Sequence, residues 1–316
     1  TSPRALPGML VVALPGASNS LYAAAMDIRP TAITGLAALA DFAIRHPRLF
    51  VLTGAGCSAE SGIPTYRDGN GDWMRPAPVT FQAFTGDDTT RRRYWARSLV
   101  GWPTMAHARP GAAHHALAQL EAAGRLQLLL TQNVDGLHSV AGSQQTIDLH
   151  GRVDTVRCMG CETRTPRSAL QAELRARNPH WAALEAQAAP DGDADLDGLD
   201  FSRFVVPDCP LCGGMLKPDV VFFGEAVPRE RVTTAFAALE AADAMLVAGS
   251  SLMVYSGYRF VQAAFAAGKP IAAVNLGRTR ADELFTLKIA QPVGQTLAAL
   301  VAALNEPIAS ARTHSN

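Results

Sequence analysis

The sequence predicts an α/β fold in which a Rossmann-like parallel sheet carries helices on both faces and a small zinc-ribbon module is attached. Two observations support this prediction. Short apolar runs that end in polar or glycine-containing loops alternate with stretches of helical periodicity, which is typical of a parallel sheet buried on both faces. Two Cys-x-x-C pairs, Cys158/Cys161 and Cys209/Cys212, interrupt that alternation.

The elements follow from periodicity in chain order. The predicted strands cover Arg48 to Thr53, Leu126 to Thr131, Ala244 to Gly249 and Pro270 to Asn275. The predicted helices cover Ala32 to Arg45, Ala113 to Ala123, Ser168 to Arg177, Arg231 to Ala242 and Ser256 to Ala267. Ligands of open parallel sheets bind at the carboxyl ends of the strands, so we expect the site in the loops that follow these runs.

The breaks in this pattern divide the chain. We expect an N-terminal extension over 1–31, a nucleotide-binding domain formed by 32–151 and 215–305, an inserted metal module over 152–214 and a flexible tail over 306–316. The acidic stretch Pro190 to Asp200 could suggest calcium. It lacks the terminal Glu of an EF-hand loop, which favours a solvated surface loop.

Charge and composition exclude several classes of partner. Lys plus Arg and Asp plus Glu number 28 each over 316 residues, so no net field attracts nucleic acid or an anionic membrane. We expect a soluble monomer. Outside the two pairs only Cys57 remains, which favours a reducing compartment over a disulfide framework. We expect a cytoplasmic protein; the mitochondrial matrix is the alternative, although the N-terminal residues lack the basic amphipathic pattern of a transit peptide.

The cysteine pairs predict one structural zinc ion. Each Cys-x-x-C turn presents two sulfurs to the same ion, and two turns complete a tetrahedral thiolate shell without an open position for water. The long stretch between Cys161 and Cys209 must loop out and return. Redox dithiols or disulfides are the alternative.

A glycine loop after the first strand predicts a dinucleotide site. Gly54-Ala55-Gly56-Cys57-Ser58-Ala59 satisfies G-x-G-x-x-A, in which the glycines permit a tight turn and close approach to a pyrophosphate at a helix N-terminus. A dehydrogenase would place an acid at the end of the next strand, roughly 20 residues on. Here the chain continues into the loop from Ser61 to Gly71, which disfavours simple hydride transfer.

Later strand ends supply further candidates. Gly249-Ser250-Ser251 offers N–H groups and hydroxyls to phosphate or ribose, with helix capping as the structural alternative. The amide of Asn275 could bind ribose. Gln132, Asn133 and Asp135 suit a carboxamide, a ribose or an ordered water, although an Asx turn would use the same residues. His150, between sheet and module, is a candidate general base or a structural histidine.

Taken together, these motifs resemble the sirtuins, the NAD-dependent protein lysine deacylases, over roughly Thr31 to Leu304. The motifs are GAGCSAESGIPTYR at 54–67, TQNVDGLH at 131–138, LHG at 149–151, the paired cysteines, KPDVVFFGE at 217–225 and GSSLMVYS at 249–256. The stretches at 93–103 and 256–260 are similar to the class II branch, which includes the mitochondrial sirtuin with lipoamidase and ADP-ribosyltransferase activity and its bacterial relatives.

The resemblance implies a mechanism. NAD is cleaved at the nicotinamide ribose while the acyl-lysine carbonyl oxygen attacks C1′, and the acyl group passes to ADP-ribose. The implied roles are carboxamide binding by Asp135 and the Ile63 backbone beside Pro64, ribose and water binding by Asn133, shielding of the reactive face by Tyr66, ordering of the loop and diphosphate by Arg67, and proton abstraction from a ribose hydroxyl by His150. Many relatives have Phe where this chain has Tyr66.

The resemblance also implies a binding strip for acyl-lysine proteins. Val221-Phe222-Phe223-Gly224-Glu225 would by itself be interpreted as a buried strand, whereas in the family a substrate peptide adds to it as a strand. Tyr94 and Arg97, three residues apart on one helical face, are similar to a pair that receives acidic acyl groups. A core-packed Tyr94 and a solvent-facing Arg97 are the alternative. We expect a preference for longer or carboxylated acyl groups.

Three functions are compatible with an NAD site in this chain. An NAD-consuming lysine deacylase is favoured because a base at His150 serves an internal acyl relay. A mono-ADP-ribosyltransferase would use the same NAD site without that relay. A noncatalytic NAD-binding scaffold would not need Asn133, Asp135 and His150 together.

Overall fold

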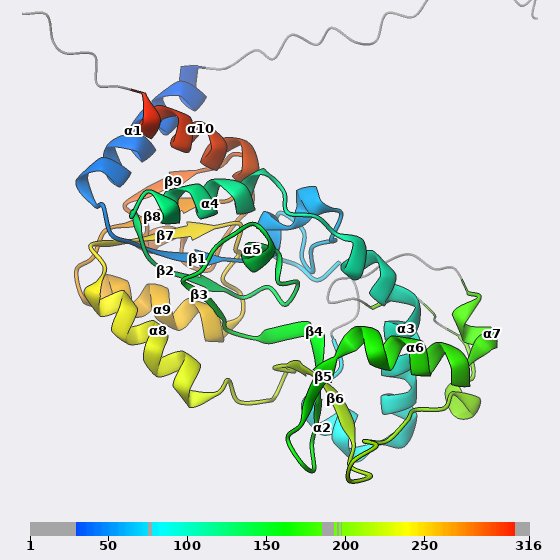
Figure 1. Cartoon of the computed structure of the whole chain (residues 1–316). Coiled ribbons are helices and arrows are strands. Elements are labelled where there is room, and N and C mark those ends of the chain that lie inside the picture. Colours follow the sequence, from blue (N-terminus) through cyan, green and yellow to red (C-terminus); the bar gives the residue numbers. More distant parts are fainter. Residues whose placement is uncertain (1–29, 75–77, 185–192, 195, 197, 307–316) are drawn as a thin grey trace, which may run out of the picture.

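The computed structural model describes residues 30–74, 78–184, 193, 194, 196 and 198–306. The predicted N-terminal extension and C-terminal tail therefore lie almost wholly outside the described residues, as does much of the acidic stretch of the module. Two unequal parts are visible in Figure 1: a large sheet flanked by helices and a smaller part with a short sheet of its own.

The large sheet has six strands in the order β3-β2-β1-β7-β8-β9. The strands are β1 (Leu49–Thr53), β2 (Leu126–Thr131), β3 (Thr146–Asp148), β7 (Ala244–Ala248), β8 (Ile271–Val274) and β9 (Leu287–Ile289). Every neighbouring pair is parallel, which confirms the predicted Rossmann-like sheet. The order reverses direction between β1 and β7, and in such sheets a crevice opens at this switch point.

Helices cover both faces of this sheet (Figure 1). On one face α1 (Pro30–Arg45), α4 (Ala112–Ala122) and α10 (Val293–Asn305) pack over side chains such as Val51 and Leu246. On the other face α8 (Arg229–Ala241) and α9 (Tyr255–Ala266) pack over the alternate side chains, such as Phe50 and Val247. Since successive strand residues point to opposite faces, the two cores explain why these strands are apolar throughout.

The smaller part is built on an antiparallel sheet in the order β5-β4-β6. Its strands are β4 (Gly151–Cys158), β5 (Arg164–Pro166) and β6 (Leu216–Val220). An aromatic core joins this sheet to α2 (Phe81–Gly86), α3 (Asp88–His107), α6 (Arg167–Arg177) and α7 (Pro179–Ala182). Among the described helices, none is long and apolar enough to cross a bilayer.

Two features differ from the sequence predictions. The small sheet takes β6 from within the range 215–305, so the second boundary of the module falls later in the chain than residue 214. The buried-strand interpretation of Val221 to Glu225 is wrong, because the strand is Leu216–Val220 and the following residues leave the sheet. In that following segment, Phe223 forms only an isolated bridge to Thr80.

Candidate functional site

A cavity of about 610 Å³ lies at the switch point, between the large sheet and the smaller part. Loops that follow β1, β2, β7 and β8 form one wall, and the segment after β6 forms another. All the predicted cofactor-binding residues line it: Gly54, Ala55, Gly56, Ser58, Ile63, Pro64, Tyr66, Arg67, Gln132, Asn133, Asp135, Gly249, Ser250, Ser251 and Asn275. Its size is in the range of small-molecule sites.

Two glycines allow the loops at the switch point to interlock. The amide of Gly56 donates to the carbonyl oxygen of Gly249 at 2.8 Å. A Cβ atom on Gly56 would lie 2.8 Å from the Gly249 Cα, and Gly249 itself has a φ of +62°. The G-x-G loop continues into two 3-10 turns, η1 (Ala55–Cys57) and η2 (Ala59–Ser61), instead of a long helix. The helix N-terminus expected at this loop is therefore formed by 3-10 turns and not by an α-helix.

Asn133, Asp135 and Ser58 form a hydrogen-bonded group on the cavity wall. The Ser58 hydroxyl donates to Asp135 Oδ2 at 2.7 Å, and Asn133 Nδ2 donates to Ser58 Oγ at 2.9 Å and to the Gly54 carbonyl at 3.1 Å. The other carboxylate oxygen of Asp135 accepts from the Leu137 amide at 2.9 Å. Asp135 can therefore form an Asx turn and still bind a ligand, because the turn fixes a side chain that borders the cavity.

A buried histidine pair lies behind this group. His114 Nε2 is 3.4 Å from Ser58 Oγ, and the rings of His114 and His138 are 4.7 Å apart. His138 Nε2 contacts the Thr53 hydroxyl at 3.0 Å. Burial lowers the pKa of both histidines, that of His138 to about 3. Both rings are therefore neutral hydrogen-bonding groups at neutral pH.

Other predicted residues are anchored locally. Gln132 Nε2 donates to Ser250 Oγ at 2.7 Å, and Asn275 Nδ2 donates to the Gly277 carbonyl at 3.0 Å. Arg67 donates to the Gly71 carbonyl at 2.7 Å and stacks on Trp73, its Cζ 3.8 Å from the ring centroid. The Arg67 contacts join residues within the loop that follows the glycine motif, and the other two join residues of the later strand ends.

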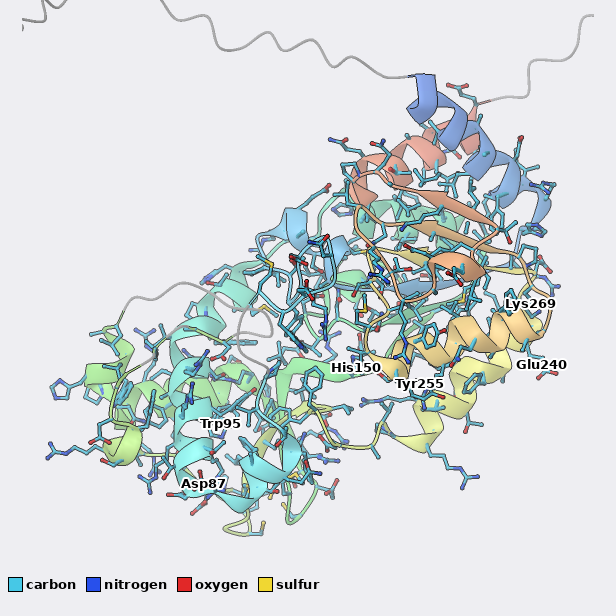
Figure 2. The ribbon with its side chains drawn as sticks, turned by 180° about the vertical axis from the view of Figure 1, so that it is seen from behind. Asp87, Trp95, His150, Glu240, Tyr255 and Lys269 are labelled. Atoms are coloured by element: carbon cyan, nitrogen blue, oxygen red, sulfur yellow. The ribbon has the colours of Figure 1, made fainter. Side chains whose placement is uncertain are left out.

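His150 lies at the junction of the two parts (Figure 2). Its Nδ1 is 2.9 Å from the Gln132 carbonyl oxygen and its Nε2 is 2.7 Å from the Ser256 hydroxyl. Burial lowers the pKa of His150 to about 4, and the positive charges of Arg259 and Arg231 act in the same direction. The imidazole is therefore neutral at neutral pH and able to accept a proton.

Gly151 fixes the chain direction after His150. Its φ is +80°, and a Cβ atom there would collide with the carbonyl oxygen of Asp219 on β6. The amide of Val221 donates to the His150 carbonyl oxygen at 2.7 Å. The candidate base and the predicted peptide-binding strip are thus adjacent through the backbone.

The predicted strip Val221 to Glu225 lines the cavity. Glu225 accepts from the Phe222 amide at 2.9 Å and from Lys217 Nζ at 3.0 Å, so its carboxylate stabilises the turn. Phe223 is 38% exposed and its ring packs edge-on against Trp73. An exposed aromatic side chain on a segment outside the sheet is available for contact with a partner.

The two residues of the predicted acyl-binding pair, Tyr94 and Arg97, lie in different surroundings. Tyr94 lines the cavity and packs against Phe84 and Phe222. Arg97 is not among the described residues of the cavity lining, and its Nε donates to both carboxylate oxygens of Asp193 at 2.9 and 3.0 Å. The Arg97 side chain is 17% exposed, so it is not the solvent-facing residue of the alternative; Asp193 of the inserted loop binds its guanidinium.

The four paired cysteines meet at the tip of the small sheet. Their Sγ atoms all lie within 4.8 Å of one another, with Cys158 to Cys212 at 3.4 Å and Cys161 to Cys209 at 3.8 Å. Tetrahedral zinc with 2.3 Å bonds places its sulfur ligands about 3.8 Å apart, so this cluster fits the ion. No Asp, Glu or His joins the cluster among the described residues, which agrees with a closed structural site.

Sequence reasoning missed three contributors to the site: Trp73, which packs on Arg67; His114, behind Ser58; and Ser256, beside His150. Only Ser256 lies inside a motif that had been singled out. His114 reaches the site through tertiary packing and Trp73 through a local bridge to Arg67, and no spacing in the sequence indicates either contact.

Comparison with known proteins gives the family. A model described as Sir2 family matches residues 54–256. An NAD-dependent protein deacetylase of Xanthomonas campestris pv. campestris (strain 8004) is 69% identical over 263 residues, covering 83% of this chain and 90% of that protein. A structure of a Sir2 homologue in complex with NAD is similar with a TM-score of 0.65 and 31% identity, covering 85% of this chain and 93% of that chain.

A second solved structure, of a Sir2 protein with a deacetylated p53 peptide and 3′-O-acetyl ADP ribose, has a TM-score of 0.69 and 29% identity. It covers 85% of this chain and 98% of the other. The model match spans more than half of the sequence and includes the glycine loop, His150 and all four paired cysteines. The chain therefore belongs to the Sir2 family, the sirtuins.

Proposed function

We propose that this protein is an NAD-dependent protein deacetylase that transfers the acetyl group of acetyl-lysine to ADP-ribose and releases nicotinamide. One observation carries the proposal. A neutral histidine, His150, faces the cavity that Asn133 and Asp135 line, and the peptide strip begins next to it. The relatives named above support it, since one is an NAD-dependent protein deacetylase and another was solved with NAD.

Each group has a role in this reaction. Asp135, held by Ser58, accepts from the carboxamide NH₂ of NAD, and Asn133 positions the ribose and a water. The acetyl-lysine segment pairs with the strip Val221 to Gly224, which brings its carbonyl oxygen to C1′ of the ribose. His150 then accepts a proton from a ribose hydroxyl, which frees that oxygen to attack the acyl carbon.

Tyr66 and Trp73 bound the cavity where water must be excluded. Their rings meet edge-on, with centroids 6.3 Å apart, and both belong to the loop that carries Arg67. Aromatic packing over the reaction centre protects an electron-poor ribose carbon from hydrolysis. We propose that this wall directs C1′ toward the acyl oxygen.

Several finer assignments belong to the same proposal. The motifs at 93–103 and 256–260 support membership of the class II branch. Acyl groups longer than acetyl would contact Tyr94 on the cavity wall, whereas a carboxylated acyl group would compete with Asp193 for Arg97. We propose acetyl-lysine as the reference substrate and a cytoplasmic location for the reaction.

Mass spectrometry of the products tests the proposal. The protein and its His150→Ala variant are incubated with NAD and peptides bearing acetyl, succinyl, glutaryl or lipoyl lysine. We expect acetyl-ADP-ribose and deacetylated peptide from the wild type, and at least a 100-fold loss of both in His150→Ala, because general-base catalysis contributes roughly 10²- to 10⁴-fold. The exposed His180, on α7, gives the matched control His180→Ala, which should retain full activity.

The other outcomes identify other functions. ADP-ribose on a protein side chain without deacetylated peptide would replace this proposal with mono-ADP-ribosyl transfer. NAD binding without any nicotinamide release would leave the noncatalytic scaffold.

A further inference from the structure

Ser256 is in direct contact with the proposed base. It is the second residue of α9, its hydroxyl lies 2.7 Å from His150 Nε2, and both residues line the cavity. Figure 2 shows His150 beside the first turn of α9, where Tyr255 is labelled. Nothing in the proposed function so far uses this hydroxyl.

The direction of the hydrogen bonds follows from chemistry. The Gln132 carbonyl oxygen can only accept, so the neutral imidazole of His150 carries its proton on Nδ1. Nε2 then presents its single lone pair, and the Ser256 hydroxyl must be the donor in the 2.7 Å contact. The Ser256 oxygen, having donated its one proton, retains lone pairs that can accept from another hydroxyl.

A helix-capping role does not account for this arrangement. The N-cap of α9 is Val254, which has no side-chain oxygen, and the Ser256 side chain is directed to the imidazole. The Ser256 carbonyl accepts from Arg259 Nε at 3.1 Å, which adds to the helical turn in fixing its backbone. The hydroxyl is therefore held against the base by the first turn of the helix.

This arrangement leaves no vacant lone pair on the base. A ribose hydroxyl reaches Nε2 directly only by displacing a short hydrogen bond in a largely buried position. The positive charges of Arg259 and Arg231 and the positive N-terminal end of α9 all disfavour the imidazolium ion. A neighbouring group that accepts a hydrogen bond from the protonated Nε2 would therefore stabilise that ion. A hydroxyl can switch from donor to acceptor by rotation, as such a partner requires.

We propose that Ser256 relays the proton from the ribose hydroxyl to His150 during acyl transfer, an inference that rests on the function proposed above. The ribose O–H bond breaks and its proton forms a new O–H bond on Ser256 Oγ. At the same time the original Ser256 O–H bond breaks and its proton forms the N–H bond on His150 Nε2. The electron pair left on the ribose oxygen forms the bond to the acyl carbon, and the π pair of the C=N bond at that carbon moves to the lysine nitrogen, which loses its positive charge. The proton now on His150 is the one that the lysine amine takes up when it leaves, so protons and electrons balance without another reactant.

Ser256→Ala and Ser256→Thr separate the relay from a structural role. Two rates are measured with an acetyl-lysine peptide: exchange of labelled nicotinamide into NAD, which precedes the base-assisted step, and formation of deacetylated peptide. We expect Ser256→Ala to lower peptide deacetylation at least tenfold while exchange stays within about twofold of wild type, since general acid–base assistance is the part removed. Ser256→Thr keeps a hydroxyl and should recover most of the lost rate.

The matched control is Ser139→Ala, which removes an exposed hydroxyl that accepts from Arg152 at 3.3 Å outside the cavity lining. Ser256→Cys replaces the hydroxyl with a somewhat larger thiol, a weak hydrogen-bond donor and acceptor, and should behave like Ser256→Ala, which guards against a folding defect in one variant. Rates in mixtures of H₂O and D₂O add a direct readout. Two protons moving together predict a curved dependence on deuterium fraction in wild type and a linear one in Ser256→Ala.

Unchanged deacetylation in Ser256→Ala would overturn the relay. An equal fall in exchange and deacetylation would also overturn it, because a misplaced helix turn would impair both steps. Failure of the proposed function gives a different pattern, since the wild type itself would then form no deacetylated peptide.

Discussion

The large sheet and the small zinc module are stabilised in different ways. Strands β1, β7 and β8 are buried at every residue, and helices seal both faces. In the module, β4 has buried residues interrupted by partly exposed ones and β5 is exposed throughout. Its core instead includes a fully buried cation, Arg167, whose Cζ lies 5.4 Å from the ring centroid of Trp95 and 5.3 Å from that of Trp102.

This difference indicates that the smaller part depends on a bound metal ion for its structure, whereas the large sheet does not. A sheet with two continuous apolar cores can fold by burial alone, at roughly 25 cal/mol per Å² of apolar surface. A three-stranded sheet with one exposed edge strand has less apolar area, and four thiolates around one ion supply the remaining order. Since the cavity lies between the two parts, loss of either part removes a wall of the site.

Removal of the metal should have the largest effect. We expect Cys158→Ser combined with Cys209→Ser, or chelation of the wild type, to unfold the module and abolish deacetylation, because the ion organises the tip of the small sheet. The measurements are zinc content, circular dichroism and product formation on the same samples. The large sheet should retain its helical signal.

Two controls sharpen this test. Cys57→Ala should keep one zinc per chain, because Cys57 is buried beside β7 and donates to the Ala248 carbonyl at 3.3 Å, away from the cluster. Zinc added back to the chelated protein should restore activity. Full activity after verified metal loss would contradict a structural role for the ion.

The pH dependence of stability tests the burial of histidines beside the large sheet. Burial lowers the pKa of His138 to about 3, whereas an exposed histidine titrates near 6.5. Between these values the unfolded chain binds more protons than the folded one, so the free energy of unfolding falls as pH is lowered. His150, with a pKa of about 4, adds to the fall, while Asp148, raised by burial to about 6, offsets part of it below that pH.

We therefore expect stability to decrease by about 1 kcal/mol per pH unit just below pH 6.5, and His138→Gln to reduce this slope. The measurement is chemical denaturation at several pH values, compared by slope, because the substitution also changes packing. His115→Gln is the matched control, since His115 is exposed on the same helix as His114. An unchanged slope in His138→Gln would assign the pH dependence to other groups.

The same contrast explains what the sequence could predict. The strands beginning at Leu49, Leu126 and Ala244 were predicted to within a residue at each end, because two-sided burial produces an uninterrupted apolar run. The glycine loop, Asn133, Asp135 and Gly249 to Ser251 were expected at one edge of the sheet because each follows such a strand, and they line the cavity. The expected places of Ile63, Tyr66 and Arg67 came from the family resemblance. The cysteine pairs predicted the metal cluster because ligand spacing is a local property.

The remaining features depend on packing between distant segments. The apolar residues between Val221 and Glu225 line the cavity. From the sequence alone, an apolar run that lines a cavity cannot be distinguished from one that is buried in a sheet. The pairing of Arg97 with Asp193 joins a helix to the inserted loop, with 95 residues between them in the chain. The role proposed for Ser256 likewise depends on the contact of α9 with His150, for which a motif alone gives no signal.

Disruption of the ion pair of Arg97 and Asp193 should have the smallest effect on activity. It tests whether the smaller part of the molecule determines which acyl group is preferred. The Asp193 carboxylate occupies the Nε of Arg97, and burial raises the pKa of Asp193 while the guanidinium opposes that shift. An acidic acyl group that binds Arg97 competes with this carboxylate, whereas acetyl-lysine does not. Asp193→Asn should therefore raise kcat/KM for succinyl-lysine relative to acetyl-lysine by severalfold, about 1 kcal/mol, as expected for one partly buried charge pair.

Arg97→Ala is the matching variant. If the guanidinium receives the acyl carboxylate once Asp193 is neutral, the double variant Arg97→Ala with Asp193→Asn should lose the gain, while acetyl-lysine turnover changes little in either background. A gain that persists without Arg97 would place the acid-binding group elsewhere on the cavity wall. No gain in Asp193→Asn would show that the pair only anchors the inserted loop to α3, and acyl preference would then depend on the apolar wall near Tyr94.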